Sequence, residues 1–378
     1  MNSSNDLYPG FSDEDIKFWT EIDELLAVLS ILFNMLSFLI SIIGILPTIF
    51  HIIVLSRKSM RTLTINAFLL GIGICDLARM MFIIMVLGPL YTEHFSHLEH
   101  PECMSPNYYS TILFALISGF TGKLVEYLSI WLAVAMAIIR SLVIKYPLNS
   151  RISDLIESKY GIRVLFLITL PIIILSIPKY FRYSIQPFGS LWVPPQNCTD
   201  FPKNYFQIQY TYVETHIFEK STDFLTGMEG VLYVIIPSIL LPISTLILIF
   251  QLRISRKKSE ALRHTSNSGG DRTTKLVTFM TISFTISTAP FGILHLVKVI
   301  VSEAIGSEGM NLIVDRIASL FPLIITINGA IHFFLCYFLS SQYRDAVREM
   351  FGRNKKSKNS ISLQHPAMST VSTFVKVE

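Results

Sequence analysis

The sequence is poor in charged residues. Asp, Glu, Lys and Arg make up only 15% of its 378 residues, whereas hydrophobic residues make up 51% and the mean hydropathy is +0.52. A soluble globular domain of ordinary composition carries about 25% charged residues. The scarcity of charge therefore excludes such a domain and indicates that the chain folds in a lipid bilayer.

The patterns of an enzyme or a metal protein are also missing. His51, His295 and His332 are isolated and lack the spacing of metal ligands, and no nucleophile and base stand together. We expect no catalytic activity, no metal, no cofactor and no nucleic-acid partner. The sequence shows no repeats and no broken helices with Gly and Pro in matching halves, which disfavours a transporter but keeps it as an alternative.

Long hydrophobic runs are abundant instead. Residues 25–55 contain no charge, and about 20 residues suffice to cross the hydrocarbon core as a helix. The seven runs that we expect to span the bilayer are Leu25–Leu55, Thr64–Leu90, Tyr109–Arg140, Val164–Pro178, Thr226–Leu252, Leu276–Ile300 and Ile317–Leu339. We predict an all-α membrane protein, a seven-transmembrane helix bundle that forms one domain over residues 25–340. An extracellular segment (1–24) precedes it and a cytoplasmic tail (341–378) follows.

The first run differs from a secretory signal peptide. Its leader is long and acidic, whereas a signal peptide has a short basic start and an apolar stretch of about 7–15 residues. We therefore predict a retained helix.

Lys and Arg are distributed unevenly between the two sides of these runs. The N-terminal segment and every second segment after it contain six, whereas the alternate segments contain 21. Because basic loops stay in the cytoplasm, we predict a multi-pass plasma-membrane protein with its N-terminus outside and its C-terminus inside. The outer segments also carry 17 acidic residues, so the outer face is net negative.

Two of the four cysteines fall in predicted outer segments. Only Cys103 and Cys198 would meet an oxidising compartment, which favours a disulfide between them, with two free thiols as the alternative. Asn2 and Asn197 match the acceptor pattern for N-glycosylation on the same side, although Cys198 crowds Asn197.

Ionisable residues inside the predicted spans are the strongest candidates for function. A charge at the bilayer centre costs a few kcal/mol unless it faces a partner, a cavity or the interface. Apart from histidines, these residues are Asp76, Arg79, Lys123, Glu126, Arg140, Glu229 and Lys298. Glu229 and Lys298 lie near helix ends, where their side chains can also reach the interface.

Arg79 and Glu126 fall at similar depths. Arg79 lies about 24 Å along its helix from the inner side, and Glu126 lies about 21 Å above Arg140. Glu126 is within about 40° of the helix face of Arg140, and Lys123 is about 60° further round. We predict that Arg79 pairs with Glu126 and that this pair forms the polar floor of an outward-facing ligand cavity, with Lys123 as a further contact. A purely structural ion pair is the alternative.

The start of the tail has an amphipathic pattern. In "SSQYRDAVREMFGRNKKSK", Tyr343, Val347, Met350 and Phe351 share one face of a helix and basic residues flank it, as in helices that lie at the membrane interface.

Several stretches together resemble the rhodopsin-like G-protein-coupled receptors, and more closely the nematode serpentine receptor class W chemoreceptors, relatives of invertebrate peptide receptors. They are "HIIVLSRKSMRTLTIN" from His51, "GIGICDLA" from Gly71, "WLAVAMAIIRSLVIKYP" from Trp131, "IPKYFRY" from Ile177, "IIPSILLP" from Ile235 and "NGAIHFFLCYFLSSQYR" from Asn328. The resemblance implies an extracellular ligand, a heterotrimeric G protein and an arrestin as partners.

The same resemblance assigns roles at the inner side. Arg140 takes the place of the arginine that meets the G protein, with Pro147 in the loop after it, and Asp76 takes the place of an acid that lies in a polar network and often accepts sodium. The usual acid before the arginine is Ile139 here. The restraint that this acid provides in the resting state is therefore made otherwise or is absent.

Further departures fall at the switch positions of the sixth and seventh helices. Thr288 replaces the usual tryptophan before Pro290. After Asn328, the seventh helix reads "HFFLC" where the family pattern is Asn-Pro-x-x-Tyr, and this places His332 and Cys336 at switch positions. The seventh helix also has no lysine at its middle, which excludes an opsin.

The ligand is the least determined partner. A negative outer face, with Glu126 and Glu229 in the spans, suits a cationic ligand such as a short basic or amidated peptide. A small odorant is the alternative. His295, Asp315 and Arg316 lie near the outer ends of the sixth and seventh spans and are further ligand-binding candidates.

Overall fold

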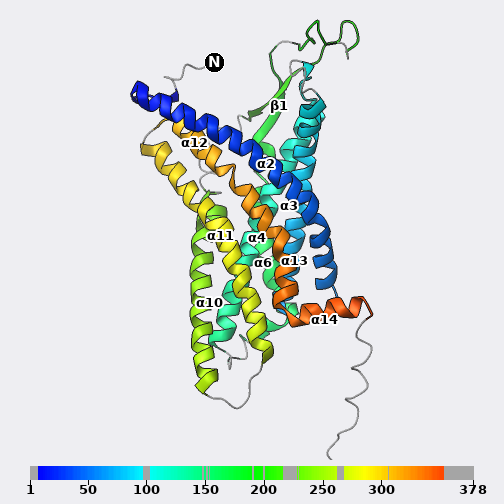
Figure 1. The fold of residues 1–378 in the computed structure, drawn as a ribbon, viewed down its shortest axis with the longest axis vertical. Coiled ribbons are helices and arrows are strands. Elements are labelled where there is room, and N and C mark those ends of the chain that lie inside the picture. The colour runs from blue at the N-terminus through cyan, green and yellow to red at the C-terminus, as the bar shows by residue number, and fades with distance from the viewer. Residues whose placement is uncertain are drawn as a thin grey trace, which may run out of the picture.

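The computed structural model is a long helical bundle with a β-hairpin at one end and a short crosswise helix at the other (Figure 1). We call these the hairpin end and the α14 end. The structure describes residues 7–96, 103–146, 149, 152, 154–189, 191–198, 201–215, 228, 230–261, 268–304 and 306–352.

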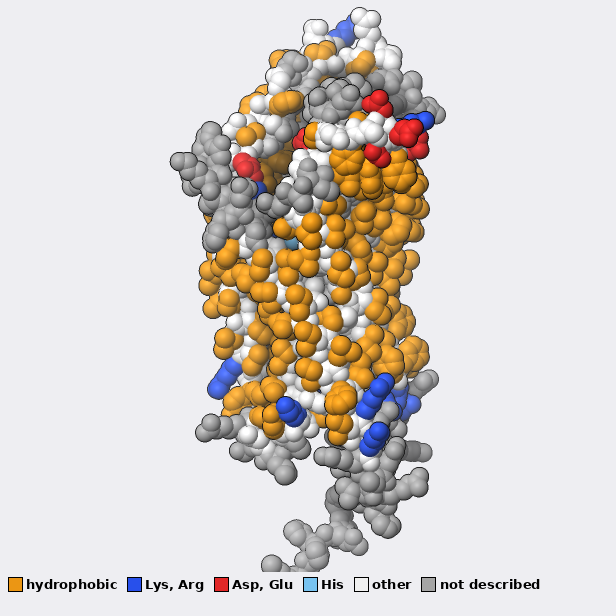
Figure 2. Space-filling view, turned by 90° about the vertical axis from the view of Figure 1, so that its left-hand side faces the viewer, with side chains coloured by type: hydrophobic (Ala, Val, Ile, Leu, Met, Phe, Trp, Pro, Cys, Tyr) orange, Lys and Arg blue, Asp and Glu red, His pale blue; other side chains and the backbone are white. Residues whose placement is uncertain are grey.

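Seven segments of the described chain are long and apolar enough to cross a membrane, which confirms the predicted number of spans. Their helices are α2 (Asp13–Leu55), α3 (Thr64–Ser96), α4 (Tyr109–Lys145), α6 (Ser158–Ser176), α10 (Ile236–Ala261), α11 (Ser268–Ala304) and the pair α12 (Glu308–Ala318) and α13 (Phe321–Leu339). Two short pieces, η2 (Asp154–Ile156) and α7 (Lys179–Arg182), flank α6. Figure 2 shows an apolar belt between acidic groups near the hairpin end and basic groups near the α14 end.

Helix α2 turns its small polar side chains inward and its large apolar side chains outward. Ser41 and Thr48 are buried, whereas Ile43 and Leu46 are 72% and 75% exposed. The hydroxyl groups of Ser41 and Thr48 donate to the carbonyl groups four residues earlier, Ser37 and Gly44, so both hydroxyl groups are satisfied within the helix. This arrangement suits a hydrocarbon solvent, where small residues let helices approach closely.

The first helix begins 12 residues earlier than predicted, at Asp13 instead of Leu25. Ser12 caps it, because its hydroxyl oxygen accepts from the backbone N–H of Asp15, and the first turn is acidic. A hydroxyl cap and negative charge both stabilise a helix N-terminus. Half of segment 1–24 therefore continues the first span as helix.

The residues before α2 pack on α12. Tyr8 is 3% exposed and lies so close to Gly309 that a Cβ atom there would be 2.3 Å from the ring. Ser307 donates to the carbonyl group of Leu7, and Arg316 pairs with Asp23 at 3.4 Å. Burial, and secondarily the charge of Asp23, raise the pKa of Tyr8. The first and last spans are thus joined at the hairpin end.

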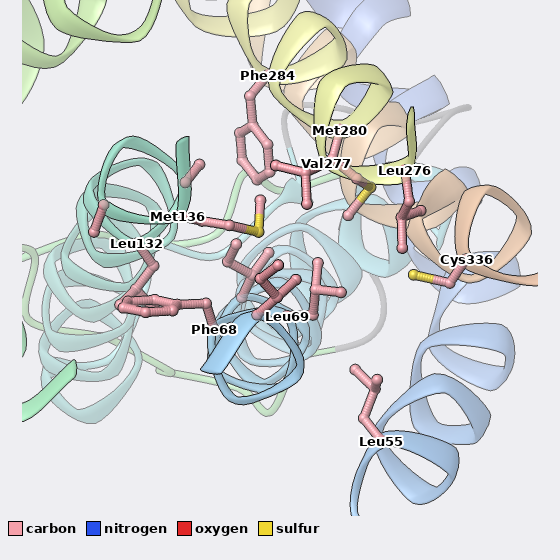
Figure 3. Close-up of a cluster of buried hydrophobic side chains, with 14 of the residues drawn as sticks. Leu55, Phe68, Leu69, Leu132, Met136, Leu276, Val277, Met280, Phe284 and Cys336 are labelled. Carbon is pink, nitrogen blue, oxygen red and sulfur yellow. The ribbon is translucent and has the colours of Figure 1, made fainter. Parts of the chain in front are cut away.

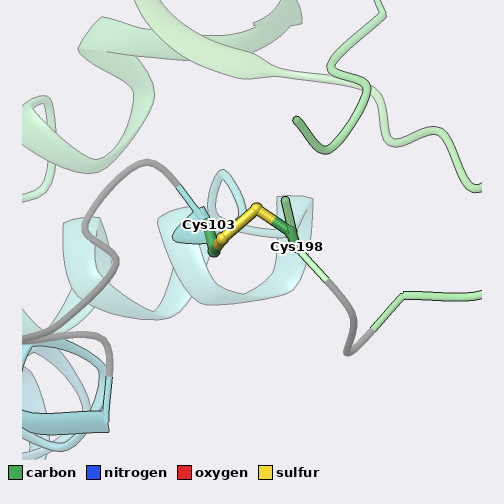
Figure 4. The surroundings of a disulfide bond; sticks show 2 residues. All are labelled: Cys103 and Cys198. Atoms are coloured by element: carbon green, nitrogen blue, oxygen red, sulfur yellow. A yellow bond between two sulfur atoms is a disulfide. The ribbon is translucent and has the colours of Figure 1, made fainter. Parts of the chain in front are cut away.

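A two-stranded antiparallel hairpin covers this end. Strand β1 (Tyr183–Pro187) pairs with β2 (Tyr210–Glu214), with Tyr183 opposite Glu214 and Pro187 opposite Tyr210. Cys198, in the connection between the strands, is bonded to Cys103, which precedes α4 (Figure 4). The predicted disulfide is confirmed, whereas the hairpin was not predicted.

The half of the bundle toward the α14 end has the main apolar core (Figure 3). Side chains from α2, α3, α4, α11 and α13 meet there, among them Leu55, Phe68, Leu69, Leu132, Met136, Leu276, Val277, Met280, Phe284 and Cys336. The half toward the hairpin end has a smaller apolar core, which leaves space for a cavity.

Helix α14 (Ser341–Met350) follows the last span, as predicted. Tyr343 and Val347 are buried, whereas Phe351 is 66% exposed. The Tyr343 hydroxyl group lies 3.0 Å from Nδ1 of His51 on α2, and this contact fastens α14 to the bundle. Burial raises the pKa of Tyr343.

Candidate functional site

A cavity of about 600 Å³ opens at the hairpin end between α3, α4 and the hairpin. Its walls are almost entirely apolar; they include Val86 and Pro89 of α3, Phe120 of α4 and Tyr183 and Tyr212 of the hairpin. A cavity of this volume lies within the range of about 300–1,000 Å³ that is typical of small-molecule sites.

Lys123 contributes the single charged group among the described residues that line this cavity. Its ammonium group lies 3.4 Å from Oε2 of Glu126, one helical turn further along α4, and 5.4 Å from the centre of the Phe291 ring on α11. The Lys123 side chain is 43% exposed and that of Glu126 only 7%. The other carboxylate oxygen of Glu126, Oε1, is buried without a hydrogen-bond partner among the described residues.

The predicted pair of Arg79 and Glu126 is wrong. Arg79 is 4% exposed and donates to Oγ1 of Thr326, at 3.0 Å, and to the carbonyl oxygen of Ile325, at 2.9 Å, both on α13. The prediction rested on helical rise and angle alone, whereas the guanidinium group of Arg79 turns toward α13. Glu126 pairs with Lys123 instead of Arg79. The flexible side chain of Lys123 is long enough to cross the angle between the two residues on the helix.

A second small space lies directly beyond Glu126. Glu126, Tyr127, Ile130, Thr288 and Phe291 are among its lining residues. The two members of the ion pair thus line different spaces: Lys123 lines the cavity at the hairpin end, and Glu126 lines the small space that Thr288, at the predicted switch position, also lines.

An aromatic contact joins α4 to the fifth span and was not predicted. Tyr127 stacks on Tyr233 at 4.8 Å, and Tyr233 lies in a π-helical turn, η3 (Gly230–Ile235), that precedes α10. Trp131 donates to the carbonyl group of Leu232 in the same turn. Lys179 lies 5.0 Å from the centre of the Tyr127 ring. Two tyrosines on separate helices give no local sequence pattern from which this stack could be predicted.

The remaining predicted ligand contacts lie at the rim of the bundle. Asp315 forms an ion pair of 2.5 Å with Lys298, and Arg316 pairs with Asp23. The ring of His295 lies 6.1 Å from that of Phe291. The structure thus places Asp315 and Arg316 in rim contacts between helices, outside the lining of the cavity. Glu229 lies outside the described residues.

Several predicted switch residues meet in the interior. Nδ1 of His332 lies 2.8 Å from Oδ2 of Asp76, and Ser129 is 3.5 Å from the other carboxylate oxygen. The amide oxygen of Asn328 accepts from Ser283 at 2.5 Å.

The sixth span is held close to the fifth near Pro290. Ser238 of α10 donates to the carbonyl group of Thr288 at 3.4 Å. Gly292 is so close to Ser238 that a Cβ atom there would lie 2.2 Å from the Ser238 hydroxyl oxygen. Pro290 lies inside α11. Cys336 is fully buried in the core toward the α14 end.

Arg140 lies in the last two turns of α4, at the end of the bundle where α14 lies, and is partly exposed. Ile139 before it is 8% exposed. Among the predicted glycosylation sites, Asn197 is exposed in the β1–β2 connection. Pro147 and Asn2 lie outside the described residues.

Seven apolar helices, a cavity between α3, α4 and a disulfide-bonded hairpin, and a further helix after the last span are the features of a seven-transmembrane receptor. The sequence model of the serpentine type 7TM GPCR chemoreceptor Srw matches residues 35–354, and the chain belongs to this family. This membership confirms the predicted receptor class and that the protein is not an enzyme.

One curated relative is the G-protein coupled receptor dmsr-1 of Caenorhabditis elegans. It is 25% identical over 170 residues, which cover 44% of this chain and 30% of the relative. The match therefore spans less than a third of the length of that receptor.

Proposed function

We propose that this receptor lies in the plasma membrane, binds a short basic or amidated peptide from outside the cell and activates a heterotrimeric G protein. Lys123, which lines the apolar cavity and forms an ion pair with Glu126 behind that lining, is the observation that carries this proposal. The hairpin end faces outward and the α14 end faces the cytoplasm, in agreement with the distribution of basic residues.

A terminal carboxamide matches the polar groups of this pair. Oε1 of Glu126 is a buried acceptor without a partner in the described part of the chain, and the ammonium group of Lys123, whose side chain is 43% exposed, is a donor. The N–H group of a carboxamide can donate to Oε1 of Glu126, and its C=O group can accept from the ammonium group of Lys123. A free carboxylate would add a negative charge beside Glu126, which is unfavourable where water is scarce.

The rest of such a peptide has complementary surroundings. Its apolar side chains would contact the walls formed by Phe120, Tyr183 and Tyr212. Its basic side chains would meet the acidic groups near the hairpin end, such as those in the first turn of α2 (Figure 2). Opposite charges on ligand and receptor raise the rate of encounter.

A small apolar odorant is the second candidate, because the cavity walls carry so few polar atoms. On the cytoplasmic side, Arg140 would contact the G protein when the sixth span moves away, and the same surface would receive an arrestin.

A matched peptide library tests this function. Each short peptide would be made as the amide and as the free acid and applied to cells that express the receptor with a promiscuous G protein. We expect an amide to activate the receptor at least tenfold more potently than its free acid. Glu126→Gln should reduce this preference, and Asp315→Asn, which changes only a rim pair, should not. Activation by odorants together with silence toward every peptide would favour the second candidate.

A further inference from the structure

The carboxylate of Asp76 is buried in the centre of the bundle. It is 3% exposed, and a charged group in such a place needs a partner of opposite charge. Among the described residues, His332 of α13 is the one basic side chain within 4 Å, with Nδ1 at 2.8 Å from Oδ2. The two atoms approach as opposite charges do, because neither has the geometry of a hydrogen bond with a described residue. His332 itself is 2% exposed.

Arg79 lies one helical turn from Asp76 and is the obvious alternative partner, but its guanidinium group binds elsewhere. It donates to the Thr326 hydroxyl group and to the carbonyl group of Ile325. Helix α3 therefore contacts α13 at two levels. The Arg79 cation binds Ile325 and Thr326. The Asp76 anion lies beside His332, about two turns further along α13.

Gly329 lies between these two levels and makes the close approach feasible. A Cβ atom at Gly329 would lie 3.0 Å from Cγ of Asp76, so the carboxylate would have to shift by a few tenths of an ångström to accommodate it. The ring of Phe284 on α11 covers the other side of His332, at 5.1 Å between centroids. The pair is thus enclosed by α3, α11 and α13.

We propose that Asp76 and His332 form a carboxylate–imidazolium ion pair that holds α13 against α3 in the receptor without ligand. This contact replaces the restraint that an acid beside Arg140 would provide, because Ile139 occupies that position. Its role in silencing the receptor rests on the proposed G-protein coupling, whereas the ion pair itself does not.

A double-mutant cycle on the full-length receptor in detergent tests the ion pair without any ligand or G protein. Asp76→Asn and His332→Asn should each lower Tm, and the double variant should lower it by less than the sum, because it leaves no unpaired charge. The matched control combines Asp76→Asn with His295→Asn, which removes an imidazole of α11 that contacts Phe291 and has no contact with Asp76 among the described residues, and its effects should be close to additive. Additive effects in the first cycle would overturn the ion pair.

Basal signalling tests the restraint. With a promiscuous G protein and normalisation to surface expression, His332→Asn should raise basal signalling about tenfold, which corresponds to about 1.4 kcal/mol. Unchanged basal signalling in a receptor that responds to peptide or odorant would overturn the restraint and leave the ion pair intact. A single variant that fails to accumulate in membranes can be compared with the double variant. Better accumulation of the double variant supports the ion pair, because it again shows that the two substitutions are not additive. Equally poor accumulation of the single and double variants contradicts the ion pair.

Discussion

Among the described residues, each buried charged side chain has a specific neighbour, on another helix for Arg79 and Asp76 and on the same helix for Glu126. Arg79 meets a carbonyl and a hydroxyl group of α13, Asp76 meets His332, and Glu126 meets Lys123. Because hydrocarbon cannot solvate a charge, these contacts determine how the helices are arranged as well as what the cavity can bind.

Gly292 gives a prediction at the scale of a single residue. Gly292→Ala would place a methyl group 2.2 Å from the Ser238 hydroxyl oxygen, and α10 and α11 must then separate. We expect this overpacking to reduce the free energy of unfolding by roughly 1–3 kcal/mol. A lower Tm of the purified receptor would report the loss. Adding Ser238→Gly removes the clashing atoms and should recover part of the loss.

The control for this substitution is Gly119→Ala. Apart from the local backbone of α4, no atom of the described residues lies within 4 Å of the corresponding Cβ position. Alanine favours a helix by up to about 1 kcal/mol over glycine, so Tm should stay the same or rise. Equal losses from both substitutions would show that the contact with Ser238 has no special effect.

At the scale of elements, the spans could be predicted because hydrocarbon demands long apolar helices, a requirement that is visible along the sequence. The disulfide could be predicted because Cys103 and Cys198 alone fall in outer segments. The hairpin could not, because its strands of five residues are joined by a long connection without a tight-turn signal. The early start of α2 is explained by the cap at Ser12, a local signal that hydropathy does not register.

The candidate site was predictable only in part. The sequence identified the charged residues of the interior, because such residues are rare in membrane spans. It could not identify their partners, since these depend on which helices are neighbours and how each is rotated. Arg79 illustrates this, because its partner was predicted on α4 and lies on α13.

The disulfide gives a prediction for the hairpin as an element. Cys103→Ser, Cys198→Ser and the double variant should all lose the tether between the hairpin and the start of α4 to the same degree. The neighbouring spans already restrict this part of the chain, so we expect a cost of about 2 kcal/mol or less, at the low end for disulfides. Thermal unfolding and surface expression measure it. Single variants as stable as the unaltered receptor would contradict a structural bridge.

At the scale of the whole molecule, the proposed orientation can be tested by cysteine labelling. Cys75 and Cys336 are buried and leave a low background for a membrane-impermeant thiol reagent. Lys203 is exposed near the hairpin and Lys257 is exposed near the other end of α10. Lys203→Cys should react on intact cells, and Lys257→Cys only after permeabilisation. The reverse result would invert the molecule in the membrane.

The contact between the first and last spans makes the bundle a closed ring. Helix α2 packs along both α3 and α13, and Tyr8 and Asp23 continue the seam at α12. The packing contacts between neighbouring helices therefore hold the bundle together, and the peptide connection between α10 and α11 is not required for this. We therefore expect that two polypeptides, one ending after α10 and the other beginning before α11, would associate through these helix contacts and form the complete bundle when produced in the same cell.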